Sequence, residues 1–130
     1  MITDRRIQAR ANLRTPLVLL RGGCAEPIGT ETENVSVEGF FCYVNILLSP
    51  GERLHFLLEL PPWPSDTCDS AVVYIQGTAE VMRVCARDSL VALGVGCHVK
   101  NYRVLKVSET FARESVLSDF LDACRNRADL

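Results

Sequence analysis

Apolar and polar side chains alternate along most of this chain with a period of two, which is typical of strands that bury one face. The segment 53–60 is the clearest case, because Leu54, Phe56 and Leu58 share one face and only Leu57 breaks the alternation. Glycine, proline and small polar residues separate such segments. The predicted strands are residues 15–21, 30–37, 40–48, 53–60, 71–85 and 90–99. Six short strands with turns between them predict a mainly β fold, a small closed or nearly closed barrel.

The last part of the chain changes period, because its apolar residues recur at the spacing of a helix. This stripe consists of Ala112, Val116, Leu117, Phe120, Leu121 and Cys124. Ser108 is suited to cap the helix N-terminus, and Glu109 would lie in the first turn. We therefore predict a C-terminal α-helix over residues 108–126 that covers one opening or one face of the barrel.

The chain of 130 residues is expected to form one domain, long enough to bury a core without a metal or disulfide. Residues 1–12 are polar and carry no apolar pattern, so they are expected to be a flexible leader. The barrel is expected to occupy residues 13–107 and the helix residues 108–126.

Two short motifs stand out against this pattern. Arg6 and Arg10 form an R-x-x-x-R pair in the leader, and Asn34, Ser36 and Gly39 form an [DN]-x-S-x-x-G motif further on. Residues 1–21 hold five arginines against one acidic residue, whereas the rest of the chain holds nine basic and fifteen acidic residues. A local basic cluster on an acidic body favours a small anionic ligand over DNA, which needs an extended basic face.

Taken together and in this order, the two motifs resemble the PilZ domain, a bacterial receptor for the cyclic dinucleotide c-di-GMP. The likeness covers about residues 5 to 100. Gly77 to Arg83 looks like the family's G-x-V-x-R strand, and Gly94 to Cys97 looks like its G-[IV]-G-F strand, with Cys97 where phenylalanine is usual. The PilZ fold is a six-stranded barrel, so the resemblance and the alternation predict the same architecture.

The resemblance implies that this chain binds c-di-GMP through residues of both motifs. The expected ligand-binding residues are Arg5, Arg6, Arg10, Asn34, Ser36 and Gly39. Arginine forks match guanine edges and phosphates, and the asparagine and serine add hydrogen bonds, while the glycine removes a Cβ at a close approach. Asparagine, serine and glycine are also ordinary turn residues, so the second motif alone would indicate only a β-turn.

The same resemblance implies further properties. An arginine at position 5, before the pair, tends in the family to go with an intercalated dimer of the ligand. The expected function is second-messenger signalling in the bacterial cytoplasm, in which the arginine segment closes on c-di-GMP and a downstream protein reads the change. The alternative is a PilZ-like adaptor that acts through protein contacts and ignores the nucleotide. Arg83 is a further residue that the resemblance brings near the ligand.

Other functions have less support in the sequence. No run of apolar residues is long enough to span a membrane, and the six cysteines lack paired metal-type spacing, so we expect reduced thiols and no metal. A zinc site is the alternative for the cysteines. His55 and His98 stand alone in strand patterns, and no phosphate loop or nucleophile motif is present. An enzyme or a cofactor-binding barrel is therefore the weaker hypothesis, and no cofactor is expected.

Overall fold

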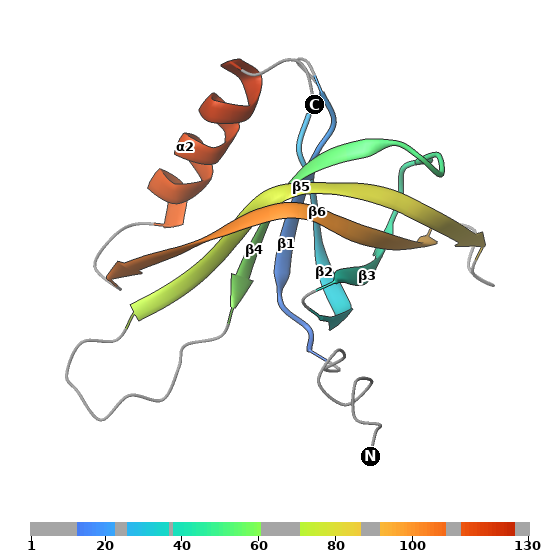
Figure 1. Cartoon of the computed structure of the whole chain (residues 1–130), viewed down its shortest axis with the longest axis horizontal. Coiled ribbons are helices and arrows are strands. Elements are labelled where there is room, and N and C mark those ends of the chain that lie inside the picture. The colour runs from blue at the N-terminus through green and yellow to red at the C-terminus, as the bar shows by residue number, and fades with distance from the viewer. Residues whose placement is uncertain are drawn as a thin grey trace.

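A computed structural model describes residues 13–22, 26–36, 38–60, 71–86, 92–108 and 113–126 of the chain. Its six antiparallel strands close into a barrel in the order β1-β2-β3-β6-β5-β4, and one α-helix follows them (Figure 1). The strands are β1 (Pro16–Leu20), β2 (Ile28–Val35), β3 (Gly39–Val44), β4 (Arg53–Leu60), β5 (Ala71–Ala86) and β6 (Leu93–Ser108). The helix α2 spans Arg113–Asn126. The mainly β barrel with a C-terminal helix that the alternation predicts is confirmed.

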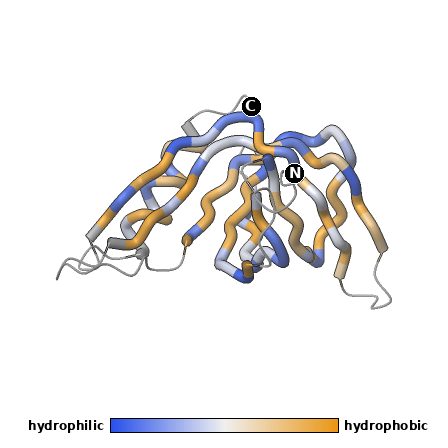
Figure 2. The backbone as a smooth tube through the Cα atoms, turned by 60° about the horizontal axis from the view of Figure 1, so that its bottom comes forward, coloured by the Kyte–Doolittle hydropathy of each residue, from blue (hydrophilic) through white to orange (hydrophobic). Residues whose placement is uncertain are grey.

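The barrel interior is filled by the inward face of every strand. Hydropathy alternates along the strands, as the change of colour along the tube in Figure 2 shows. Leu19, Leu54 and Val95 are 0% exposed, and the rings of Phe40 and Phe56 pack with centroids 5.4 Å apart. Burial of such side chains contributes about 1.5 to 3 kcal/mol each. The period-two pattern therefore identified the core face correctly.

The strands β5 and β6 run well beyond the barrel, as the two long arrows that cross the molecule in Figure 1. Beyond His98, β6 no longer pairs with β3 and pairs only with β5, up to the pair Ala71↔Ser108. The prediction that this strand ends at Val99 is wrong, and so is Ser108 as a helix cap, since Ser108 ends β6. The reason is that apolar residues occur on both faces of this half of β6, with Tyr102 and Val104 exposed and Leu105 and Val107 on the other face, so the alternation is lost.

A second core lies outside the barrel, between α2 and the outer faces of β1, β4 and the β5–β6 extension. It consists of Leu20, Leu57, Tyr74, Val116, Phe120 and Cys124. Leu57, the residue that breaks the alternation of β4, is 5% exposed because α2 covers it. The helical stripe is confirmed for its described members. Within the part of the chain that the structure describes, no helix meets the length and hydropathy needed to cross a membrane.

Candidate functional site

The structure places one of the two motifs. Asn34 lies near the end of β2 opposite Phe41 of β3, Ser36 lies in the connection between these strands, and Gly39 is the first residue of β3. Arg5, Arg6 and Arg10 lie outside the described residues, so whether they meet the second motif stays a prediction.

Ser36 and Gly39 have structural tasks in the β2–β3 connection. The Ser36 Oγ accepts hydrogen bonds from the backbone N–H of Glu38 at 3.1 Å and of Gly39 at 3.2 Å. A Cβ on Gly39 would stand 2.1 Å from the carbonyl oxygen of Cys97 on β6. The glycine thus permits close contact between β3 and β6, for a reason that does not involve a ligand. Ligand contacts by these two residues stay predictions.

Asn34 lines a shallow depression on the outer surface of the barrel. The depression has a volume of about 550 Å³, and its walls are Arg14, Glu33, Asn34, Phe41 and Tyr43. The Nη2 of Arg14 lies 3.3 Å from a carboxylate oxygen of Glu33, in an exposed ion pair. Within the described part of the chain, the Asn34 carboxamide makes no hydrogen bond, so its donors and acceptors face the depression or solvent.

Phe41 and Tyr43 form an aromatic pair on this outer face, with ring centroids 5.3 Å apart in an edge-on arrangement. Gly94 of β6 makes room for them, because a Cβ there would stand 2.6 Å from the Phe41 ring and 3.3 Å from the Tyr43 ring. The side chain of Arg83 crosses Gly96 beside Phe41, since a Cβ on Gly96 would touch both. The alternation of β3 contains the signal for this pair: two aromatic rings stand on the face opposite to the core.

Residues 13–15, which lead into β1, are hydrogen-bonded to β2 beside this depression. The Thr32 Oγ1 donates to the carbonyl oxygen of Leu13 at 2.6 Å and accepts from the N–H of Thr15 at 3.1 Å. These bonds hold residues 13–15 against β2.

The basic cluster predicted for residues 1–21 is divided in the structure. Arg21 lies past the other end of β1, where its Nε is 2.6 Å from a carboxylate oxygen of Glu52 and its Nη2 donates to the carbonyl of Leu47. Burial raises the pKa of Glu52, but hydrogen bonds from Arg21 and Ser49 and the charge of Arg21 outweigh it and hold that pKa below its usual value. Arg21 therefore stabilises a loop and does not belong to the candidate site.

The described cysteines are free thiols and are not grouped as metal ligands. Among the residues that the structure describes, Cys42, Cys85, Cys97 and Cys124 are free thiols. No group of three potential metal ligands occurs in the same described ranges. Burial raises the pKa of the Cys97 thiol to about 12. The pKa of the Cys42 thiol is also raised to about 12, mainly by burial and to a smaller extent by the neighbouring Cys97. Such thiols are protonated at neutral pH and pack as small apolar side chains.

Comparison with known proteins supports the fold. No family model matches the sequence, and no curated protein sequence matches it. Among solved structures, the chain is similar to the inhibitor of motility (MotI/DgrA) of Bacillus subtilis, with a TM-score of 0.58 and 17% sequence identity. The match covers 95% of this chain and 51% of that chain, so this chain spans about half the length of the Bacillus protein. At this sequence identity the likeness shows the fold alone.

Proposed function

We propose that this chain is a receptor for c-di-GMP that signals to another protein in the bacterial cytoplasm and carries out no catalysis. The observation that carries the proposal is the depression at Asn34. It combines a carboxamide that has no hydrogen bond to any described residue, an aromatic pair, and residues 13–15, which lead into β1. The order and spacing of the two motifs supply the identity of the ligand.

The chemistry of the ligand matches these groups. c-di-GMP carries two guanines and two phosphates, which arginine side chains bind through paired, charge-assisted hydrogen bonds. Arg6 and Arg10 would supply those forks, and the Asn34 carboxamide would bond a guanine edge. The faces of Phe41 and Tyr43 would stack against a base, an interaction of about 1 to 3 kcal/mol per base.

The signal would pass to a separate protein. The described part of this chain is a barrel and one helix, and the structurally similar Bacillus protein is named as an inhibitor of motility. We propose that the segment carrying Arg5, Arg6 and Arg10 changes conformation when c-di-GMP binds and that a downstream protein recognises the closed form. Hydrogen exchange of residues 1–12 should slow in saturating c-di-GMP, and unchanged exchange would contradict this switching step.

Isothermal titration of c-di-GMP into the full chain tests the receptor function. Arg6→Ala and Asn34→Ala should each weaken binding roughly tenfold or more, because each removes charged or bidentate hydrogen bonds. Phe41→Ala should weaken it by loss of stacking. Arg125→Ala is the matched control, since it removes an exposed arginine from α2, and it should bind as the parent does.

The stoichiometry of the same titration tests the intercalated dimer. We expect two c-di-GMP molecules per chain, because Arg5 precedes the arginine pair. One molecule per chain would exclude the dimer and leave the receptor function standing. No binding by the parent chain would instead favour an adaptor that acts through protein contacts alone.

A further inference from the structure

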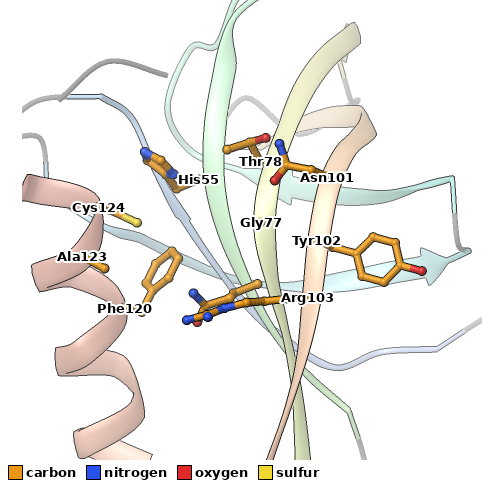
Figure 3. Close-up of a pocket in the computed structure, with 10 residues that line it drawn as sticks. His55, Gly77, Thr78, Asn101, Tyr102, Arg103, Phe120, Ala123 and Cys124 are labelled. Atoms are coloured by element: carbon orange, nitrogen blue, oxygen red, sulfur yellow. The ribbon is translucent and has the colours of Figure 1, made fainter. Parts of the chain in front are cut away.

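A second, separate cleft lies between α2 and the extended part of the sheet (Figure 3). Its volume is about 500 Å³, within the range of pockets that hold small metabolites. Strands β4, β5 and β6 form its floor and α2 its wall. None of the residues that line the depression at Asn34 takes part in it.

Two cross-strand rows make up the floor. His55, Thr78 and Asn101 stand opposite one another on β4, β5 and β6, and Gln76 stands opposite Arg103 in the next row on this face. Spacings of neighbouring strands and of alternate residues give this floor a size of about 10 Å by 7 Å. These five side chains together offer imidazole, hydroxyl, amide and guanidinium groups to anything that lies on it.

The polar floor continues directly from the apolar helix interface. The row after Gln76 holds Tyr74 and Leu105, which pack under α2 with Phe120. At the level of the cleft, the facing residues of α2 are the buried Phe120 and the small Ala123, which does not fill the space. The strand register that packs Tyr74 and Leu105 under α2 therefore leaves, next to the second core, a space whose floor consists of polar side chains.

The side chains that line the cleft are buried at one end and exposed at the other, and the charged side chain lies at the exposed end. His55 and Phe120 are 8% and 2% exposed and form its closed end, whereas Asn101 and Arg103 lie at the exposed edge. Figure 3 shows the Arg103 side chain extending from β6 toward α2, while its neighbour Tyr102 points away. Among the described residues, Arg103 has no ion-pair partner, and it is the only arginine, lysine, aspartate or glutamate that lines the cleft.

We propose that this cleft binds a small anionic metabolite that carries a planar, hydrogen-bonding ring. The ring lies on the polar floor against Phe120, where Thr78, Gln76 and Asn101 bond its edge. The acidic group, a phosphate or a carboxylate, pairs with Arg103 at the open side. This site does not depend on the binding of c-di-GMP at Asn34.

Titration of the uniformly ¹⁵N-labelled full chain tests the proposal by amide chemical shifts. The probes are AMP, which has a ring and a phosphate, and nicotinate, which has a ring and a carboxylate. At least one of them should give saturable shifts at residues 76–78, 101–103 and 120–124. Saturation by AMP alone assigns a phosphate, and saturation by nicotinate alone assigns a carboxylate.

Two variants and one control locate the binding. Arg103→Met should lower the affinity for the probe roughly tenfold or more, because it removes a charge-assisted hydrogen bond. Ala123→Phe keeps every polar group but fills the cleft, and it should abolish binding. Lys106→Met is the matched control, because Lys106 lies on the opposite face of the same strand, and it should bind as the parent does.

Several results would overturn the site. These are no saturable shift with either ringed probe at millimolar concentration, equal affinity in Arg103→Met, or unchanged binding in Ala123→Phe. Inorganic phosphate binding as tightly as AMP would overturn the role of the ring. The receptor proposal is judged separately, because c-di-GMP should shift residues 34, 41 and 43 whether or not the cleft is occupied.

Discussion

At Gly39 the packing leaves room for a hydrogen atom and nothing larger. The carbonyl oxygen of Cys97 on the neighbouring strand occupies the position that a Cβ would approach. The sequence motif suggested that this glycine serves a ligand, whereas the structure gives it a task in joining β3 to β6. The two tasks are separable, because the free energy of unfolding reports the joining of the strands and ligand affinity reports contact with a ligand.

Gly39→Ala should lower the free energy of unfolding by about 2 to 4 kcal/mol, since the new methyl group forces two hydrogen-bonded strands apart. Gly29→Ala is the control, because a Cβ on Gly29 would meet no atom within 4 Å. It should change stability by less than about 1 kcal/mol. Urea unfolding of both variants measures the difference, and equal stabilities would contradict the close approach.

The thiols of Cys42 and Cys97 make stability depend on pH in the alkaline range. Their pKa values are raised to about 12 by burial, so the folded state holds two protons that the unfolded chain releases near its ordinary thiol pKa. This contribution is complete below about pH 8.5 and is lost progressively as pH rises toward 12.

We expect the free energy of unfolding to fall by roughly 1 kcal/mol per pH unit for each of these thiols above pH 9. Urea unfolding between pH 8 and pH 11 measures the slope. Cys42→Ala should make the slope shallower, whereas Cys85→Ala should leave it unchanged, because Cys85 is exposed. A slope that is the same in all three proteins would rule out burial of the thiol proton.

At the scale of elements, α2 explains residues that the strand pattern could not. Its apolar stripe is readable from the sequence, but the surface that it covers is assembled from β1, β4, β5 and β6. Leu57 on β4 breaks the period of two for this reason. The far half of β6 also becomes a strand only because β5 pairs with it.

Phe120→Ala should lower the free energy of unfolding by about 3 to 5 kcal/mol, because it opens a cavity in the second core. Ser118→Ala on the exposed side of the same helix should change it by less than about 0.5 kcal/mol. Thermal or urea unfolding compares the two. A small effect of Phe120→Ala would mean that α2 does not pack on the sheet as described.

At the scale of the whole molecule, the barrel separates two surfaces with different chemistry. The depression at Asn34 lies on β2 and β3, and the cleft under α2 lies on β4, β5 and β6. The two sites share no residue, so substitutions in one should have additive effects with those in the other. We propose that the first surface binds a cyclic dinucleotide and the second a smaller anion.

The sequence by itself determined what depends on neighbours along the chain. Alternation identified the inward faces, helical spacing identified the stripe of α2, and the spacing of polar residues drew attention to Asn34, Ser36 and Gly39. Each of these signals is local, since a strand or helix turns its side chains at a fixed period. The motif also suggested a ligand, which no local pattern can test.

Only the tertiary structure decided which residues meet. Three such contacts join different strands: the aromatic pair on Gly94, the contact of Gly39 with Cys97, and the row of His55, Thr78 and Asn101. Strand register sets these contacts, and a shift of one residue would turn every side chain to the other face. That register must both close the barrel and place Leu57 under α2. Both requirements involve several strands at once, so no single segment of the sequence specifies them.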